Sequence, residues 1–196
     1  MNLDAAEIRV LGCLVEKQRT TPDTYPLSLN ALRLACNQAT NREPVVELDE
    51  VKIRTALAGL SKRGYARLAS GPTSRAVKYR HLLDEALELD DKEISVLTLL
   101  MLRGAQTPGE LKQRTERLHR FAAVAEVIET LEWLVERELV ARLPRRPGQK
   151  EERYEQLLGG DGSAEAAAPA EEDTLAAFER RLRELEQRVE ALEESR

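Results

Sequence analysis

Residues Val51 to Arg80 carry the strongest chemical signal in the sequence, because this stretch of 30 residues contains eight lysines and arginines and no acidic residue. The chain as a whole has a net charge of −5. A local positive field of this kind attracts polyanions even when the whole chain is acidic. A solvated surface that keeps the protein soluble is the alternative interpretation. The absence of acids favours phosphate binding.

The basic stretch begins on a helix that the sequence predicts from an N-cap at Asp49 to a C-terminal glycine, Gly64. A helical wheel places Thr55, Gly59 and Lys62 opposite the apolar stripe of this helix. Lysine and arginine neutralise phosphates or bind a guanine edge, and threonine contacts either backbone or base. The predicted contacts to double-stranded DNA are Lys52, Arg54, Thr55, Lys62, Arg63, Arg67, Arg75 and Lys78.

A second group of polar residues lies between this helix and the one expected before it. About ten residues separate the two helices, whereas the turn of a helix-turn-helix usually has three or four. Asn37 and Asn41 could cap the helix and satisfy local backbone groups. The alternative is a polar pocket or a contact to the DNA backbone. The members of this possible polar loop site are Asn37, Gln38, Asn41 and Arg42.

No residues show the spacing of a catalytic site, and we expect no enzymatic activity, metal or cofactor. The two histidines, His81 and His119, have no HxxxH or HExxH neighbour, and we expect both to be exposed. Cys13 and Cys36 each lie on the apolar side of an expected helix, which favours a place in the core. The sequence also contains no GxGxxG or GxxxxGK[ST] phosphate loop.

The sequence contains no signal for a membrane or for secretion. The N-terminus lacks a basic patch followed by an apolar segment. The most apolar stretch, Val96 to Leu102, is too short to cross a bilayer. We therefore expect a cytoplasmic protein.

An internal repeat predicts the architecture that positions the basic residues. Glu7–Leu11 returns 86 residues later as Glu93–Leu97, and Ala66–Leu68 returns 75 residues later as Ala141–Leu143. The smaller second offset means that the first copy contains about a dozen additional residues between these segments. Two copies of one small domain are the simplest explanation.

Each copy is predicted to form three helices followed by a β-hairpin, which is the winged helix-turn-helix pattern. The predicted fold is therefore mainly α with small β-hairpin wings, in two domains over residues 1–84 and 85–158. In this fold the third helix enters the major groove and the wing reaches the neighbouring backbone. The acid-free stretch coincides with the third helix and the wing of the first copy.

The third helix of the second copy, expected over residues 122–137, has the opposite charge. Its glutamates recur at steps of three or four residues and overlap on one side of the helix. They are Glu126, Glu129, Glu132 and Glu136. This side would repel DNA phosphates, so the second domain either contacts the DNA backbone by its wing or binds a protein. We favour a protein partner.

The C-terminal region reads as a flexible acidic linker over residues 159–173 and a heptad helix over residues 174–196. A narrow apolar seam of this kind requires a partner. Either two chains pair into a coiled-coil dimer or the helix docks on its own domains, and the strict spacing favours pairing. The expected dimerisation residues are Leu175, Phe178, Leu182, Leu185, Val189 and Leu192.

Several motifs in residues 4–158 resemble the YceH-like family of bacterial proteins, whose function is uncharacterised. These motifs are Tyr25–Leu32, Ala35–Gln38, Asn41–Arg42, Leu102–Leu111 and Leu143–Gln149. The resemblance implies a tandem winged-helix fold, in agreement with the repeat. It leaves the activity open.

Two functions remain in competition. The first is a DNA-binding protein, a dimeric transcriptional regulator that contacts DNA through its first winged helix. The second is a non-enzymatic scaffold that resembles the tandem winged-helix subunit of bacterial condensin and has protein contacts only. The basic stretch favours the first function, and the acidic second copy favours the second.

Overall fold

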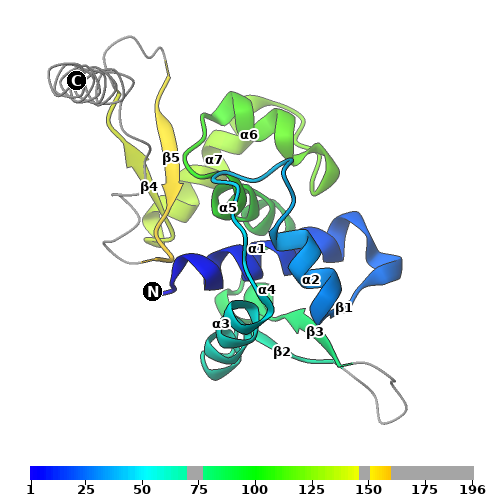
Figure 1. Cartoon of the computed structure of the whole chain (residues 1–196). Coiled ribbons are helices and arrows are strands. Elements are labelled where there is room, and N and C mark those ends of the chain that lie inside the picture. The colour runs from blue at the N-terminus through cyan, green and yellow to red at the C-terminus, as the bar shows by residue number, and fades with distance from the viewer. Residues whose placement is uncertain (70–76, 146–150, 160–196) are drawn as a thin grey trace, which may run out of the picture. The chain divides into compact units, whose positions relative to one another are not determined.

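The computed structural model describes residues 1–69, 77–145 and 151–159. All of these residues belong to one compact unit, Met1–Asp161. The unit is mainly helical with small antiparallel sheets, as the sequence predicts. Figure 1 shows α1 and α5 at its centre, with α6 and α7 on one side and α2, α3 and α4 on the other.

The first half begins with a capping box. The Asp4 carboxylate accepts a hydrogen bond from the Glu7 amide at 2.8 Å, and the Glu7 carboxylate accepts one from the Asp4 amide at 2.9 Å. Asp49 caps α3 through the amide of Lys52 at 2.8 Å, as the sequence predicts. The elements are α1 (Ala5–Thr20), η1 (Pro22–Thr24), β1 (Leu27–Ser28), α2 (Leu29–Cys36), α3 (Glu50–Lys62), β2 (Ala66–Leu68) and β3 (Lys78–His81).

The second half repeats the order of three α-helices followed by two strands, after α4 (Leu83–Leu87), a helix that the sequence analysis did not predict. Asp90 and Glu93 form a capping box 86 residues after the first one. Residues 84 and 85, the expected domain boundary, lie inside α4. The remaining elements are α5 (Asp91–Arg103), α6 (Pro108–Arg114), η2 (Thr115–Arg117), α7 (Val124–Glu136), β4 (Val140–Leu143) and β5 (Arg153–Gln156).

The third helices of the two halves correspond residue by residue. α3 and α7 each have 13 residues and are offset by 74. Both end in a left-handed residue at the same position, Gly64 with φ 79° and Glu138 with φ 56°. Glycine adopts this conformation without steric cost, whereas a glutamate there is uncommon. The predicted repeat is therefore present in the backbone as well as in the sequence.

The strands also match between the halves. The first sheet has the order β1-β3-β2, with Leu27 opposite Tyr79. The second sheet consists of β4 and β5, and an isolated bridge joins Gln106 to Tyr154 in the place that β1 occupies in the first half. The registers differ by one residue, because Tyr79 faces Leu68 whereas Tyr154 faces Arg142.

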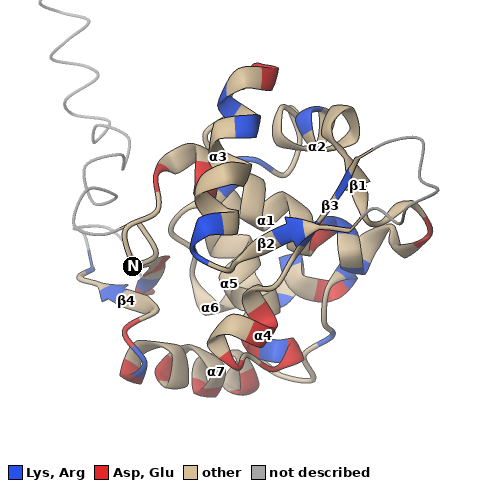
Figure 2. Cartoon of the chain, turned by 90° about the horizontal axis from the view of Figure 1, so that it is seen from below, with Lys and Arg blue, Asp and Glu red and all other residues tan. Residues whose placement is uncertain are grey.

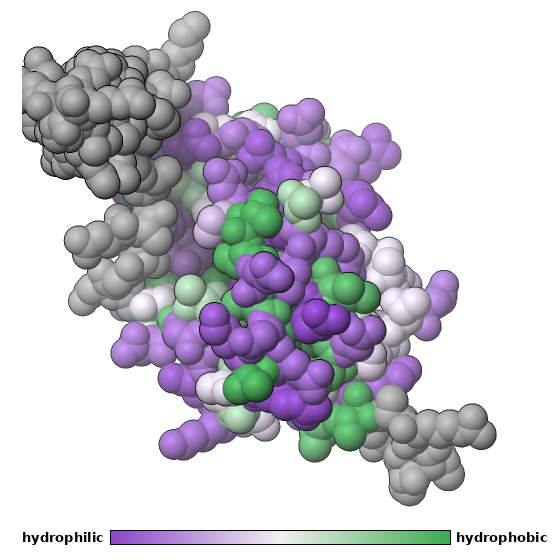
Figure 3. All heavy atoms as spheres, in the orientation of Figure 1, coloured by the Kyte–Doolittle hydropathy of each residue, from purple (hydrophilic) through white to green (hydrophobic). Residues whose placement is uncertain are grey.

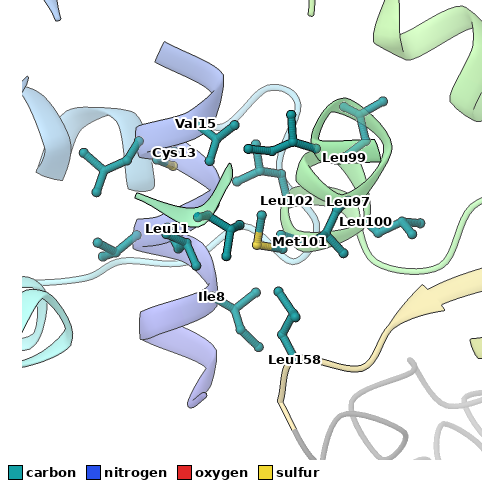
Figure 4. Close-up of a cluster of buried hydrophobic side chains, with 14 of the residues drawn as sticks. Ile8, Leu11, Cys13, Val15, Leu97, Leu99, Leu100, Met101, Leu102 and Leu158 are labelled. Atoms are coloured by element: carbon teal, nitrogen blue, oxygen red, sulfur yellow. The ribbon is translucent and has the colours of Figure 1, made fainter. Parts of the chain in front are cut away.

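The two halves share one hydrophobic core, whose centre is the contact between α1 and α5 (Figure 4). A Cβ atom on Gly12 would lie 2.9 Å from Leu102 Cδ2 and 3.2 Å from Met101 Cβ, so the absence of a side chain lets the helices approach closely. Cys13 and Cys36 are both buried in this core. The first half consequently packs on the second within one compact unit.

Candidate nucleic-acid interface

The solvent side of α3 carries most of the cations that the sequence analysis selected. Ile53, Leu57 and Leu60 are at most 5% exposed and attach the helix to the core. Lys52, Arg54, Thr55 and Lys62 are exposed, as is Arg67 on β2. Figure 2 shows basic residues on α3 and β2 and acidic residues along α7, at the opposite edge of the view. We call Lys52, Arg54, Thr55, Lys62 and Arg67 the basic face.

Two side chains of the basic face make local contacts that solvent weakens. The Arg54 guanidinium lies 2.7 Å from Glu50 Oε1 one turn earlier, and both side chains are more than half exposed. Such a pair contributes about 0.3–0.5 kcal/mol, so a phosphate can replace the carboxylate. The Thr55 hydroxyl donates to the Val51 carbonyl at 3.0 Å and keeps its oxygen as an acceptor.

Arg63 has a structural role that the sequence analysis did not anticipate. Its guanidinium donates to Glu7 Oε1 at 2.7 Å and to the Asn2 carbonyl at 3.1 Å, which joins the end of α3 to the start of α1. The same contact recurs in the second half, where Arg137 Nη1 lies 3.8 Å from Glu93 Oε2. Because the acidic second copy keeps this arginine, packing between helices accounts for it better than DNA contact.

Gly59 corrects one part of the helical-wheel analysis. The wheel placed it opposite the core, but a Cβ atom on Gly59 would lie 1.9 Å from Glu7 Oε1. Glu7 is 4% exposed, because α1 packs against this side of α3. Gly59 therefore makes room for the buried Glu7 carboxylate and is not a surface for a ligand.

The two strands after α3 place charged and apolar side chains on opposite sides of their sheet. Arg67 faces Arg80 across the β2–β3 pair, and the next pair joins Leu68 to Tyr79, whose side chains point to the other side. Arg80 Nη2 lies 2.5 Å from Glu85 Oε1, and Lys78 is half-buried. Arg75, which was also predicted to contact DNA, lies outside the described residues.

The loop from Asn37 to Asp49 brings the four predicted polar residues together, but their polar groups bond within the protein. The Asn37 side-chain amide donates to the Leu48 carbonyl and accepts from the Leu48 amide, both at 2.9 Å. The Arg103 guanidinium donates to Asn41 Oδ1. The Asn37 bonds match the first interpretation, in which the asparagines satisfy backbone groups, whereas the Asn41 side chain bonds to the Arg103 side chain.

Arg42 is the centre of this loop. Its side chain is 0% exposed and donates to Glu16 Oε2 at 2.5 Å, to Gln38 Oε1 at 3.1 Å and to the Ala35 carbonyl at 3.2 Å. Burial opposes the charge, but the hydrogen bond that Arg42 donates to Glu16 and the neighbouring negative charge together outweigh burial and raise the pKa of Arg42. The arginine is thus held charged inside the fold.

Arg9 is a buried residue whose structural role the sequence analysis did not anticipate. Its guanidinium is 5% exposed and donates to the Cys36 carbonyl at 3.3 Å and to the Pro44 carbonyl at 2.6 Å. Burial lowers the pKa of Arg9. The available signal was a charged residue inside the apolar run Ile8–Val15. Arg9 and Arg42 together hold the loop that leads into α3 and so position the basic face.

His81 is buried, which corrects the expectation that it is exposed. Its imidazole Nε2 bonds to Gln18 Oε1, and its Nδ1 accepts from the Leu83 amide at 3.3 Å. Burial lowers the pKa of His81 to about 4 and raises the pKa of Tyr25, whose hydroxyl accepts from the His81 amide, to about 12. The neutral ring is part of the packing between β3 and α1.

The solvent side of α7 is acidic along its length. Glu129, Glu132 and Glu136 are exposed, and Glu126 Oε1 lies 2.5 Å from Lys92 Nζ on α5. Trp133 is 52% exposed among them. We call Glu126, Glu129, Glu132 and Glu136 the acidic face. Its charge opposes any approach of nucleic acid on this side.

Other kinds of site are absent from the part of the chain that the structure describes. Within it, no three His, Cys, Asp or Glu side chains gather where they could hold a metal ion. None of the described helices has the length and hydrophobicity that a membrane span requires.

Comparison with known proteins identifies the family. A family model described as "Protein of unknown function, DUF480" matches residues 3–149. A UPF0502 protein from Enterobacter sp. (strain 638) is 46% identical over 206 residues, which cover 97% of this chain and 95% of that protein. UPF0502 proteins from Klebsiella pneumoniae (strain 342) and Geobacter metallireducens are 48% and 52% identical, over 97% and 83% of this chain and 89% and 75% of theirs. The chain therefore belongs to the DUF480 family of bacterial UPF0502 proteins, which confirms the resemblance to the YceH-like family.

Proposed function

We propose that the protein binds double-stranded DNA through α3 and the strands β2 and β3. The observation that carries this proposal is the exposed basic face, within a stretch from Val51 to Arg80 that contains no acidic residue. Phosphate contacts from lysine and arginine supply most of the affinity of sequence-independent DNA binding. A cationic surface on one helix and the adjoining strand is the arrangement that such contacts need.

The order of the elements supports a winged helix in each half. The first half runs α1, β1, α2, α3, β2 and β3, with the strand order β1-β3-β2. In a winged helix the third helix enters the major groove and the hairpin approaches the backbone. α3 is about 20 Å long at 1.5 Å per residue, which suffices to cross a groove about 12 Å wide.

This mode of binding assigns a role to each exposed side chain. Thr55 and Lys62 lie opposite the buried stripe of α3 and would face the groove, where they can contact bases or phosphates. Arg67 on β2 would contact the flanking backbone. Arg9 and Arg42 act as positioning residues, because they fix the loop that determines the direction of α3.

The six expected dimerisation residues lie outside the described residues, and the sequence of the C-terminal region supports a dimer, with DNA bound as two half-sites. With Leu175 at heptad position a, Arg181 and Arg188 fall at position g, and Glu186 and Glu193 fall at position e. In a parallel pair, position g of one chain faces position e of the following heptad on the other, so each arginine would meet a glutamate. We therefore propose a parallel pair of chains and a dimeric transcriptional regulator.

A second candidate function rests on the acidic face. An exposed tryptophan among four glutamates suits a basic protein partner better than DNA. If the basic face served only solubility, the protein would be a scaffold with protein contacts, like the tandem winged-helix subunit of bacterial condensin. The first function requires DNA binding that weakens steeply with salt, whereas the second requires no DNA binding.

The experiment that tests the proposal measures DNA affinity against salt concentration, with random genomic fragments and with any motif enriched from them. For a phosphate-dominated complex, the logarithm of the affinity falls by about 0.9 per phosphate for each logarithmic unit of salt. We expect the double variant Lys62→Glu/Arg67→Glu to lose at least about tenfold in affinity and to reduce the magnitude of this slope by about 2.

A matched control is Arg117→Glu/Arg120→Glu, which makes the same change in net charge at exposed residues of the second half. We expect its DNA affinity to stay within about twofold of the unmodified protein. Equal losses in both variants would mean a general charge effect. A protein that binds no DNA at low salt would contradict the proposal and favour the scaffold.

A further inference from the structure

Cys13 and Cys36 form a pair of thiols between α1 and α2. Cys13 lies near the middle of α1, and Cys36 is the last residue of α2. Their side chains are hydrogen-bonded to each other, and both residues are 0% exposed. Figure 4 shows Cys13 on α1 beside α2, and these two helices are in contact. Neither cysteine takes part in the proposed contact with DNA.

Two buried arginines lie next to this pair. The Arg42 side chain forms hydrogen bonds with Cys13 and with Glu16. Arg9 donates to the Cys36 carbonyl at 3.3 Å, and its positive charge also acts on Cys13. Glu16 opposes the two arginines, so the balance of charge around the Cys13 sulfur is positive. Positive charge of this kind stabilises a thiolate, which is the nucleophilic form of cysteine.

The surroundings make the two thiols unequal. Burial raises the pKa of Cys13, but the hydrogen bond from Cys36 and the charges of Arg42 and Arg9 outweigh burial and lower it. The pKa of Cys36 is raised, first because its thiol is hydrogen-bonded to Cys13 and then because the residue is buried. Cys13 is therefore the thiol that ionises, and Cys36 is the thiol that keeps its proton. An ionised thiol in contact with a protonated one is suited to disulfide formation.

The second half shows that packing alone does not require these sulfur atoms. Counted from the capping boxes of α1 and α5, Cys13 corresponds to Leu99. Counted from the N-caps of α2 and α6, Cys36 corresponds to Thr115. Both counterparts are buried as well. Each of the two places in the fold thus accepts a side chain without sulfur, and only the first half combines a pair of thiols with buried arginines.

The loop of residues 37–49 lies over the pair and limits access to it. Arg42 of this loop contacts Cys13, and Arg9 donates to the loop's Pro44 carbonyl at 2.6 Å. Figure 3 shows apolar residues on the face that this loop crosses only as small separate patches among polar ones, which offer no groove for a bulky oxidant. The loop contains no helix or strand before residue 50, so its local opening costs less free energy than unfolding of the whole unit. Such an opening admits a molecule as small as hydrogen peroxide.

We propose that Cys13 and Cys36 are a modification site, which hydrogen peroxide converts into a disulfide between α1 and α2. The Cys13 thiolate attacks one peroxide oxygen and the O–O bond breaks. Cysteine sulfenic acid forms, and the other oxygen leaves as hydroxide, which takes up the proton that Cys13 had released.

The second step uses the protonated thiol. The Cys36 sulfur attacks the Cys13 sulfur, the S–S bond forms and the S–O bond breaks, and the hydroxide leaves as water with the Cys36 proton. Overall, two thiols are oxidised by two electrons and one peroxide is reduced to two water molecules. Because Cys36 is the last residue of α2, the shift that brings the sulfurs to a bond length of about 2.05 Å falls on the end of that helix.

The first test treats the full chain with hydrogen peroxide at neutral pH, followed by trypsin digestion without reduction and mass spectrometry. We expect a disulfide-linked pair of peptides, residues 10–17 and 34–42, and an intact mass lower by about 2 Da. Dithiothreitol should restore both thiols. Thiols that persist at peroxide concentrations sufficient to oxidise free cysteine would overturn the proposal. A disulfide that joins two chains, seen as a dimer on a non-reducing gel, would overturn it as well.

The second test assigns the roles of the two sulfur atoms with a matched pair of variants. In Cys36→Ala the attacking thiolate has no partner, and we expect Cys13 to gain oxygen, about 16 Da for each atom. In Cys13→Ala the remaining thiol keeps its proton, and we expect its oxidation to be at least about tenfold slower. Circular dichroism checks that both variants are folded. Equal rates in the two variants would overturn the assignment of Cys13 as the attacking sulfur.

A control separates local opening from unfolding of the whole unit. Gly59→Ala disturbs the packing of Glu7 against α3, away from the thiol pair. If peroxide reached only unfolded chains, this variant would be oxidised about tenfold faster than the unmodified protein. We expect its rate to stay within about twofold, and a tenfold rise would overturn oxidation of the folded protein. None of these measurements uses DNA, so their failure would leave the DNA-binding proposal in place.

Discussion

α3 and α7 are the same helix built twice, with opposite surfaces. They have equal length, end in a left-handed residue at the same position, and each pairs its C-cap arginine with the capping-box glutamate of the first helix in its half. On the solvent side, Lys52, Thr55, Ala58 and Lys62 correspond to glutamates in α7: Glu126, Glu129, Glu132 and Glu136. The buried residues thus specify the fold, and the exposed residues differ because nothing in the packing constrains them.

The segments that precede these helices differ as well. The loop before α3 is long and is held by Arg9 and Arg42, and its Glu43 amide donates to the Leu102 carbonyl of α5 at 2.8 Å. The connection before α7 contains only η2 and a short stretch after it. The additional residues of the first half therefore serve to fix its third helix in place.

The largest effect should come from removing the centre of that loop. We expect Arg42→Met to lower the free energy of unfolding by about 3 kcal/mol, because Glu16 then loses its buried partner. Urea titration followed by circular dichroism measures the change. Arg33→Met on α2, whose guanidinium donates to Asn30 near the surface, should change the free energy by less than about 0.5 kcal/mol. Equal effects would mean that the loop contributes no special stability.

Acid should destabilise the first half through His81. Its pKa is about 4 in the folded protein and 6.5 in the reference state, so between these values the unfolded chain binds a proton that the folded chain does not. The contribution of His81 to the free energy of unfolding should be complete above pH 6.5. The free energy of unfolding should then fall by up to about 3 kcal/mol as the pH drops to 4. The second half has Gln156 at the matching position, where its Oε1 accepts from the Leu158 amide as His81 Nδ1 accepts from Leu83.

The variant His81→Gln copies the second half and provides the control. Its free energy of unfolding should change less between pH 6.5 and 4 than that of the unmodified protein. An unchanged pH dependence would show that His81 is not the responsible group.

A smaller effect on the free energy of unfolding should distinguish a substitution at Gly59 from one at its counterpart in α7, Trp133. We expect Gly59→Ala to cost about 1–2 kcal/mol, because the new methyl group displaces the Glu7 carboxylate from Arg63. Trp133 occupies the same position in α7 and is 52% exposed, so Trp133→Ala should change the free energy of unfolding by no more than about 0.5 kcal/mol. Thermal unfolding of both variants tests this contrast, and a tolerated Gly59→Ala would contradict it.

The smallest effect should come from transplanting part of one surface onto the other. The variant Glu129→Thr/Glu132→Ala/Glu136→Lys gives α7 the residues of α3 at these positions. We expect its DNA affinity to rise about fivefold at low salt, with a salt slope steeper by about 1. A rise that is independent of salt would mean that charge is not the relevant difference between the helices.

The sequence was sufficient for the features that local patterns determine. The start of α3 at Asp49 and the repeat itself follow from spacing and cap chemistry, and each is present. The buried places of His81 and Arg9 could not be read from the sequence. Their partners, Gln18 and Pro44, are distant along the chain, so no local pattern records the contact.

The candidate site was predictable in part for the same reason. The side of α3 that faces solvent follows from its apolar stripe, and Lys52, Arg54 and Lys62 were placed correctly. The structural role of Arg63 depends on Glu7, which lies 56 residues earlier. The sequence did contain an indication of this role in its counterpart, Arg137. An arginine retained at the matching position of the acidic copy indicates a structural role that both copies share.

The close contact of α1 with α5 at Gly12 has a consequence for the history of the gene. A duplication that began with two self-sufficient copies would have left each able to persist alone. Once the helices met at a glycine, the apolar side of α5 required α1 as its cover, and Leu102 would lie bare without it. Loss of either copy would therefore expose the apolar core of the other, whereas changes on the outer surfaces leave this contact intact. The shared core thus keeps the two halves together, while their exposed surfaces differ in sequence.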